Sequence, residues 1–341
     1  MRIGLNATCF NDRPSGALQR FIGIYGEVFK LMPDSTFYIF EPSDFKLDIF
    51  FTESNNIIFV PTPIPSQGRI RKLLKGLNFW PSTLNKYDLD IFECFNLPLV
   101  TSSSISLATI HDIRGLKNSL FSLNYWVAKI THYHLFRNIN RVITVSDTMR
   151  DEIQSLYPDS DVHVVYNGLD YSMFQQVTWE QILEVKDHLN LPNQFLLTVG
   201  HFEERKNFLR LIDALDILRN EDISVSLIII GNNNGYLKKI LKKLDNLNLR
   251  DQVTILTGLT NLELYCVYML SNAFIFPSTY EGFGIPILET MSVGKPYTLS
   301  NLPVFKEITQ NQGNYFNPND PNDIASSIKE ILSNKEEQER L

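Results

Sequence analysis

The stretch PSTYEGFGIPILETMSVGKP, residues 277–296, decides the fold class of this chain. The apolar run Ala273–Phe276 in front of it is typical of a buried strand. Pro286 marks the start of a helix, because the first turn of a helix tolerates a residue without an N–H. The stretch therefore predicts a strand, a tight loop and a helix N-terminus in direct succession.

Two carboxylates, Glu281 and Glu289, stand on either side of this loop. We expect Glu289 in the first turn of the helix, where the helix dipole favours a negative charge. Glu281 lies on the loop beside Gly282 and Gly284, and glycine lets backbone approach a ligand closely. Such a loop fits a sugar or nucleotide pocket whose carboxylates bind hydroxyl groups. A glycine-rich turn with solvated acids is the alternative.

Outward from this stretch, short apolar runs alternate with helical periodicity along the whole chain. Runs such as SLIIIG are typical of parallel strands that are covered on both faces. The alternation predicts an α/β fold with doubly wound sheets. The expected strands are Ile3–Leu5, Phe37–Phe40, Ile57–Val60, Ile91–Phe95, Leu107–Ile110, Val142–Val145, Phe195–Val199, Val225–Ile230, Val253–Leu256 and Phe274–Phe276.

The length of 341 residues favours two domains, and we expect them over residues 1–175 and 176–341 with a ligand-binding cleft between them. The net charge is −7 and neither half has a basic excess, so no nucleic-acid partner is expected. Three separated cysteines indicate a reducing compartment. Without a signal segment or an apolar run of about 18 residues, we expect a cytoplasmic protein.

Arg205 and Lys206 lie between the strand that ends at Val199 and a helix that Asn207 is expected to cap. Two cations beside a helix N-terminus oppose its dipole, and this makes sense if an anion lies between them. The segment therefore predicts a phosphate site. The alternative is a pair of exposed cations that Glu203 and Glu204 balance.

Two weaker signals lie in the first half of the chain. Gly16 ends a turn-rich loop after the first strand, and it could let that loop border a phosphate or an acceptor. His111 ends the strand Leu107–Ile110, where a substrate can be met, and Asp112 could fix its tautomer or cap the next turn. A structural histidine at a strand end is the alternative.

A basic segment with Arg69, Arg71, Lys72 and Lys75 stands out in this acidic chain. A solvated helix face is one interpretation. Peripheral contact at the inner face of a membrane, with anionic lipid or with a lipid-diphosphate acceptor, is the other. No metal site is expected, because the sequence has no HExxH motif and no cysteine cluster, and the pair Asp88 and Asp90 directly precedes a strand and fits a turn.

Together these segments resemble the retaining glycosyltransferases of family 4, the group 1 glycosyltransferases with the GT-B fold of two facing Rossmann-like domains. The resemblance is strongest from Phe195 to about Pro321. It rests on Arg205-Lys206-Asn207, on Gly294-Lys295-Pro296 and on the family's E-x7-E motif, which matches Glu281 and Glu289. The family usually continues with further helical sequence beyond this chain's last residues.

The resemblance implies roles for named residues. Arg205 and Lys206 would bind the donor diphosphate and stabilise its leaving charge. Glu281 would hold the donor sugar, Glu289 the ribose, and His111 would contact the sugar near the reacting carbon. The remaining implied donor-binding residues are Gly16, Leu259, Thr260, Phe283, Gly284 and Ile285.

The implied activity is transfer of a hexose from a nucleotide diphosphate sugar to a glycan or lipid-linked saccharide acceptor, with retention and without a metal or other cofactor. Bacterial surface polysaccharide synthesis, such as O-antigen, lipopolysaccharide or capsule, is the hypothesis for its role, and GDP-mannose for its donor. A sugar-nucleotide epimerase, a phosphorylase and a non-catalytic nucleotide-sugar-binding subunit are the alternatives.

Overall fold

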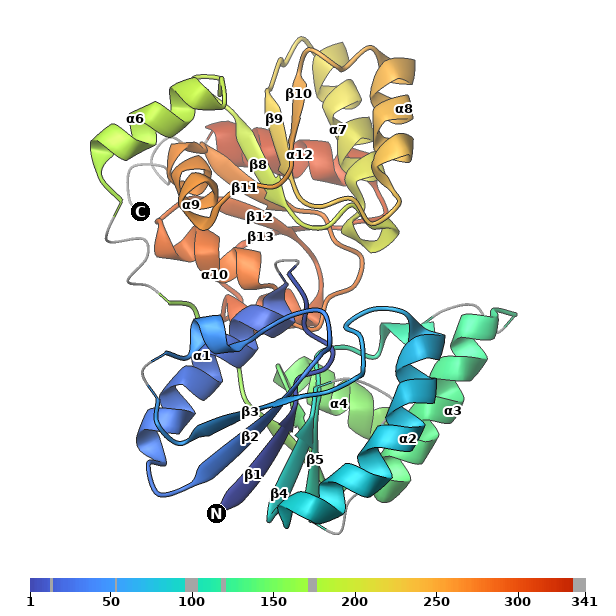
Figure 1. Ribbon diagram of the computed structural model, residues 1–341. Coiled ribbons are helices and arrows are strands. Elements are labelled where there is room, and N and C mark those ends of the chain that lie inside the picture. Colours follow the sequence, from blue (N-terminus) through green and yellow to red (C-terminus); the bar gives the residue numbers. More distant parts are fainter. Residues whose placement is uncertain (13–14, 53, 96–103, 118–120, 171–176, 334–341) are drawn as a thin grey trace. The chain divides into compact units, whose positions relative to one another are not determined.

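The computed structural model describes the chain except for residues 13–14, 53, 96–103, 118–120, 171–176 and 334–341. The described chain divides into two units, Met1–Gly168 and Leu169–Leu341. The domain boundary predicted between residues 175 and 176 lies outside the described residues. Each unit has one parallel sheet with helices on both of its faces, so the α/β prediction is confirmed (Figure 1).

The N-terminal unit has a seven-stranded sheet in the order β3-β2-β1-β4-β5-β6-β7. Its strands are β1 (Arg2–Asn6), β2 (Thr36–Glu41), β3 (Ile57–Pro61), β4 (Ile91–Cys94), β5 (Ile105–Ile110), β6 (Arg141–Thr144) and β7 (Val162–Val164). Its α-helices are α1 (Gly16–Leu31), α2 (Arg69–Tyr87), α3 (Leu123–Asn138) and α4 (Asp147–Leu156), and its 3-10 turns are η1 (Asp48–Phe50) and η2 (Arg114–Lys117).

The C-terminal unit has a six-stranded sheet in the order β10-β9-β8-β11-β12-β13. Its strands are β8 (Leu196–Val199), β9 (Leu227–Ile230), β10 (Val253–Leu256), β11 (Ala273–Phe276), β12 (Tyr297–Ser300) and β13 (Asn314–Phe316). Its helices are α6 (Trp179–His188), α7 (Phe208–Asn220), α8 (Leu237–Leu247), α9 (Asn261–Leu270), α10 (Ile285–Ser292), α11 (Pro303–Ile308) and α12 (Pro321–Ser333), and η3 (Glu204–Lys206) is a 3-10 turn.

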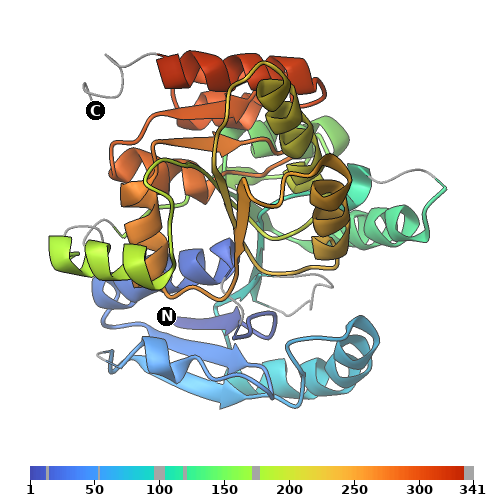
Figure 2. The ribbon, with the colours of Figure 1, turned by 90° about the horizontal axis from the view of Figure 1, so that it is seen from above.

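Both faces of the C-terminal sheet carry a core. Leu211 and Leu215 of α7 belong to one cluster, together with apolar residues of α8 and α12. Tyr268 of α9 and Ile287 of α10 belong to the cluster on the other face. Helix α12 packs along α7 (Figure 2). Strands β9 and β11 are buried along their whole length, as their continuous apolar runs predict.

The ten predicted strands are all present, but three further strands escaped prediction. β7, β12 and β13 are only three or four residues long, and β12 contains Thr298 and Ser300 at buried positions. The Ser300 hydroxyl donates to the Phe276 carbonyl at 3.2 Å. Thr298 meets the Ser327 hydroxyl of α12. These hydroxyls are tolerated in the core because neighbours far along the chain bond them, which no local pattern reveals.

The basic segment at Arg69–Lys75 begins a helix of 19 residues. Trp80 and Leu84 of α2 are buried against the N-terminal sheet. Its first turns instead expose apolar side chains, and Ile70 is 75% exposed. No described helix is long and apolar enough to cross a bilayer.

Candidate donor site

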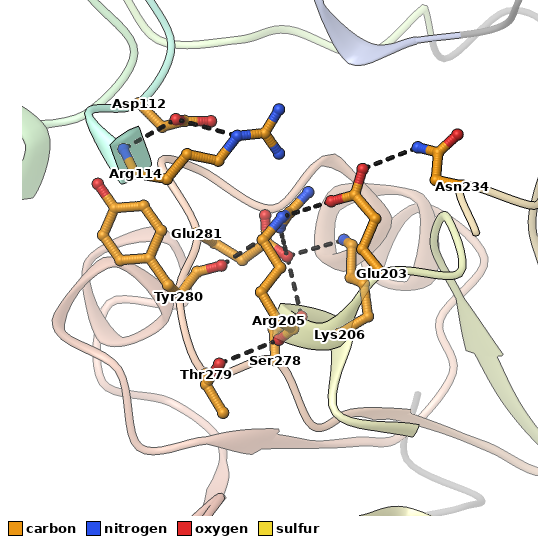
Figure 3. A network of polar contacts seen from close by, with 10 residues as sticks. All are labelled: Asp112, Arg114, Glu203, Arg205, Lys206, Asn234, Ser278, Thr279, Tyr280 and Glu281. Atoms are coloured by element: carbon orange, nitrogen blue, oxygen red, sulfur yellow. Dashed lines mark hydrogen bonds and ion pairs between the residues drawn. The ribbon is translucent and has the colours of Figure 1, made fainter. Parts of the chain in front are cut away.

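The strongest site lies where β8 and β11 end side by side in the C-terminal sheet. These two strands pair in parallel, and the chain leaves them toward opposite sides of the sheet order. Ligands of doubly wound folds bind at such a switch point. Arg205 and Lys206 of η3 follow β8, and the loop with Ser278 and Glu281 follows β11 (Figure 3). Residues predicted separately from the sequence therefore meet at one place.

The Glu281 carboxylate bridges the two cations. Its Oε1 atom lies 2.6 Å from a terminal nitrogen of Arg205 and 2.7 Å from Nζ of Lys206. The Ser278 hydroxyl donates to the same oxygen at 2.9 Å. Ionised partners make short and strong hydrogen bonds, so these three contacts hold the carboxylate firmly.

Further contacts fix the two cations in place. Arg205 donates through Nε to Glu203 at 2.9 Å and through a terminal nitrogen to the Tyr280 carbonyl at 3.2 Å. Lys206 Nζ lies 4.5 Å from the centre of the Phe276 ring, a favourable cation–π distance. The Lys206 side chain is only 8% exposed, so the alternative of two exposed cations balanced by Glu203 and Glu204 is wrong.

The charges in this cluster change one another's proton affinity. Burial by itself raises the pKa of Glu281, but the charges of Lys206 and Arg205 outweigh it and lower that pKa to about 2. Burial lowers the pKa of Lys206, and the nearby Glu281 charge opposes this shift. Glu281 is therefore ionised throughout the neutral range.

The two loops are also joined through their backbones. Thr279 donates its N–H to the Arg205 carbonyl at 2.8 Å. The Asn207 amide donates to the carbonyls of Pro277 and Pro318 at 3.1 and 2.7 Å. Asn207 directly precedes α7, but the prediction that its side chain caps the helix is wrong. Its backbone is left-handed, and its amide is bonded to these two carbonyls instead. It ties η3 to the loop after β11 instead.

Glu289 differs from Glu281 in its surroundings. Helix α10 begins at Ile285, so Glu289 is its fifth residue and the prediction of a first-turn position is wrong. Its carboxylate is buried and accepts a hydrogen bond of 2.6 Å from the Tyr268 hydroxyl of α9. Burial raises its pKa, and the bond from Tyr268 opposes that shift. The ribose-binding role stays a prediction.

The other residues of this unit that were predicted to bind the donor lie in the same loops or at the starts of helices. Gly284 has a φ of +130°, and a Cβ there would come within 3.1 Å of Ile287, so only glycine suits the entry to α10. Phe283 is buried beside it. Thr260, which follows Leu259, caps α9 and exchanges hydrogen bonds with Glu263. Capping explains this threonine without a ligand.

Gly16 and His111 belong to the N-terminal unit. Gly16 is the first residue of α1, directly after the capping Ser15. His111 follows β5, and burial together with the Arg20 charge lowers its pKa to about 4. Asp112 accepts a hydrogen bond from the Arg114 N–H at 3.1 Å. It therefore caps the following turn, which is one of the two roles predicted for it.

No cluster of three or more His, Cys, Asp or Glu side chains that could hold a metal occurs among the described residues. Asp90 accepts the Arg2 N–H at 2.7 Å, and Asp88 pairs with the Arg2 guanidinium. Both aspartates therefore serve the turn before β4, as the sequence predicts.

Two neighbours of the site were not predicted: Ser278, which donates to Glu281, and Gly200, which lies against Lys206. A Cβ on Gly200 would lie 2.8 Å from Cε of Lys206, so the missing side chain leaves room for the lysine. The signal was present, since Gly200 directly follows β8 and glycine at a strand end often marks a close approach. Nothing local could indicate which group approaches.

Two glycosyltransferase family models match this chain. "Glycosyl transferases group 1" matches residues 181–341, and "Glycosyltransferase Family 4" matches residues 37–172. Together the two matches span most of the chain and meet near the division between its two units.

Similar proteins include two curated mannosyltransferases. The O-antigen chain mannosyltransferase RfbU of Salmonella typhimurium is 30% identical over 241 residues, which are 69% of this chain and 62% of RfbU. The serotype-specific mannosyltransferase WbdA of Escherichia coli is 31% identical over 197 residues, which are 57% of this chain and 23% of WbdA. The matches thus span less than two thirds of either relative.

Among solved structures, HepE of Anabaena in complex with UDP and glucose has a TM-score of 0.74 with 17% sequence identity. The match covers 99% of this chain and 91% of HepE. At this identity the likeness concerns the fold, which is the GT-B fold.

Proposed function

We propose that this chain, which belongs to the group 1 glycosyltransferases of family 4, transfers a hexose from a nucleotide diphosphate sugar to a glycan or lipid-linked acceptor with retention at the anomeric carbon. The observation that carries the proposal is the contact of Arg205 and Lys206 with Glu281 at the ends of β8 and β11. A ligand bound at this contact would meet two cations and a carboxylate together, which supports the proposal.

In this proposal Arg205 and Lys206 neutralise the diphosphate as it leaves. Charge develops on the leaving oxygen in the transition state, and fixed cations in a half-buried site stabilise it without having to reorganise. Lys206 is held between Glu281 and the Phe276 ring, so its ammonium is already in place before the donor binds. Since protein charge does this work, we propose that transfer needs no metal.

The remaining residues orient the donor. Glu281 accepts hydrogen bonds from the sugar hydroxyls, and Glu289 takes the ribose. The backbone around Phe283, Gly284 and Ile285 lines the sugar and the phosphates. In the N-terminal unit, Gly16 borders the phosphates, and His111 contacts the sugar as a neutral imidazole because its pKa of about 4 leaves it uncharged at neutral pH.

The names of the relatives support a narrower version of the proposal. RfbU and WbdA are mannosyltransferases, and RfbU acts on the O-antigen chain by its name. We propose GDP-mannose as the donor and bacterial surface polysaccharide synthesis as the role.

We also propose peripheral contact between α2 and the inner face of a membrane. Arg71 and Lys75 are exposed on the same helix as Ile70, Leu74 and Leu77, which are exposed as well. Exposed apolar groups beside cations suit an anionic lipid surface. Binding of the purified protein to vesicles with and without anionic lipid tests this contact.

A screen of nucleotides tests the donor site. UDP, GDP, ADP and dTDP are each added to the purified protein, and the midpoint of thermal unfolding is measured. A ligand that binds only the folded protein at 100 times its Kd stabilises it by about 2.7 kcal/mol, so one of the four should raise the midpoint by several degrees. A flat response to all four would contradict the proposed function.

The replacement Lys206→Ala tests catalysis. Loss of one preorganised charge should lower transfer from GDP-mannose by about 100-fold or more, measured as kcat/KM with a lipid-linked or glycan acceptor. Lys329→Ala is the matched control, because Lys329 belongs to the same unit and pairs only at the surface with Glu221. Normal transfer by Lys206→Ala would show that the site is wrongly assigned.

A further inference from the structure

The anion that occupies the two cations in this structure is the chain's own carboxylate. Glu281 Oε1 lies within 2.7 Å of both Arg205 and Lys206, and its side chain is only 11% exposed. Cations beside the start of a helix at a strand end are a place where proteins bind phosphate. Here a glutamate stands where the diphosphate of a donor would bind.

A diphosphate at the same nitrogen atoms would lie beside the Glu281 carboxylate, and the two negative groups repel each other. The contact uses a terminal nitrogen of Arg205 and Nζ of Lys206, and the Phe276 ring takes a further side of the ammonium. Arg205 also donates to Glu203, so the four side chains balance in charge. An incoming diphosphate therefore competes with the Glu281 carboxylate for the two cations.

We propose that Glu281 competes with the phosphates for Arg205 and Lys206 and thereby makes the site prefer a nucleotide sugar over the free nucleoside diphosphate. This inference rests on the proposed function. Both ligands displace the carboxylate, but only the nucleotide sugar brings hydroxyl groups that can donate to it afterwards. With the free diphosphate, a displaced carboxylate loses charged partners and gains none, which lowers the affinity for that ligand.

The consequence concerns product release. After transfer the sugar has left, and the hydroxyls that engaged Glu281 have left with it. The carboxylate then returns to Arg205 and Lys206 and competes with the remaining diphosphate. Specificity here comes from weakening the binding of the wrong ligand, in addition to contacts with the right one.

Calorimetry on the full chain tests the inference with three ligands: inorganic pyrophosphate, GDP and GDP-mannose, or the matching pair for whichever base stabilises the protein. In Glu281→Gln, pyrophosphate and the free diphosphate should bind about tenfold tighter than in the wild type, which corresponds to about 1.4 kcal/mol. The ratio of nucleotide-sugar affinity to free-diphosphate affinity should fall by at least that factor.

A second variant covers the case in which Glu281→Gln folds poorly. Ser278→Ala removes the hydroxyl that holds Glu281 Oε1 but keeps all charges, and it should tighten pyrophosphate binding by a smaller factor. Glu221→Gln removes one exposed carboxylate of the same unit and should change neither affinity. This control separates the competition from a general change in net charge.

The outcomes are distinct. Tighter diphosphate binding together with a reduced preference for the nucleotide sugar supports the inference. Unchanged or weaker diphosphate binding in both variants overturns it while the proposed function stands. If neither the wild type nor the variants bind any diphosphate or pyrophosphate, the proposed function itself fails.

Discussion

Each unit of this protein holds a largely buried glutamate near the end of a central strand, and the pKa values of the two are shifted in opposite directions. Glu281 of the C-terminal unit is surrounded by the charges of Arg205 and Lys206, and its pKa is lowered to about 2. Glu93 of β4 is only 4% exposed, and it accepts bonds from the hydroxyls of Thr109, at 2.5 Å, and Tyr25. Burial raises its pKa, and those two bonds only oppose the shift.

The difference shows that burial acts to raise the pKa of both carboxylates and that their partners decide whether this rise is reversed. Two adjacent cations outweigh the loss of hydration at Glu281, whereas two hydroxyls and the Arg20 charge do not outweigh it at Glu93. Glu289 agrees with this rule, since it is buried against the hydroxyl of Tyr268 and its pKa is also raised. The two glutamates of the same E-x7-E motif are therefore chemically different.

The largest expected effect comes from replacing each glutamate by glutamine. Glu281→Gln leaves Arg205 and Lys206 without their buried counter-charge, and it should lower the free energy of unfolding by about 3 kcal/mol. Glu93→Gln keeps one acceptor oxygen for the two hydroxyls and should lower it by about 1 kcal/mol. Urea unfolding at pH 7 measures both, and equal losses would contradict the comparison.

The pH dependence of stability should separate the two glutamates as well. The folded-state pKa of Glu281 is about 2 against an ordinary 4.5, so its stabilisation is complete above about pH 4.5 and is lost as the pH falls toward 2. This amounts to about 3 kcal/mol, at 1.36 kcal/mol for each unit. The wild type should therefore lose its advantage over Glu281→Gln in acid.

For Glu93 the sign is reversed. Its raised folded-state pKa means that the folded protein binds the proton more tightly, so ionisation removes stability as the pH rises above about 4.5. Glu93→Gln should thus approach the wild type as the pH increases. Unfolding curves of the three proteins between pH 3 and pH 7 measure both trends, and parallel curves would refute them.

Gly200→Ala should disturb the cluster without unfolding the protein. The new methyl group would lie 2.8 Å from Cε of Lys206, and the end of this long side chain has to move. We expect pyrophosphate or diphosphate affinity to fall about tenfold while the unfolding midpoint changes little. Gly23→Ala in α1 is the control, because a Cβ there meets no atom within 4 Å. Unaltered affinity would show that the position of Lys206 is unimportant.

The smallest effect is expected at Thr260. Hydrogen bonds from the Thr260 backbone and hydroxyl lower the pKa of Glu263 at the start of α9. Thr260→Ala removes this cap and should lower the free energy of unfolding by about 1 kcal/mol, with Thr260→Ser close to the wild type. If Thr260 serves only as a cap, donor affinity is unchanged in both variants. A loss of affinity in Thr260→Ala alone would instead place the hydroxyl in the donor site.

Much of the fold could be predicted from local patterns. Apolar runs such as Leu227–Ile230 show their strand character directly, because strands buried on both faces need no polar alternation. The short strand Tyr297–Ser300 could not be recognised, since its buried hydroxyls depend on bonds to Phe276 and to α12. The prediction for Glu289 was wrong because Gly284 lets α10 begin at Ile285, which puts Glu289 beyond the first turn. The prediction for Asn207 was wrong because its side chain bonds to the loop after β11 and not to α7.

The sequence by itself determined the alternation of strands and helices and the presence of Glu281, Arg205 and Lys206 after strands, because hydrophobic periodicity and chain order are local properties. Only the tertiary structure decided which charges meet. Parallel pairing places the ends of β8 and β11 side by side, and this brings Glu281 to Arg205 and Lys206. The pKa values of these groups depend on the distances between their charges and on the loss of hydration, and both are set only when the chain folds.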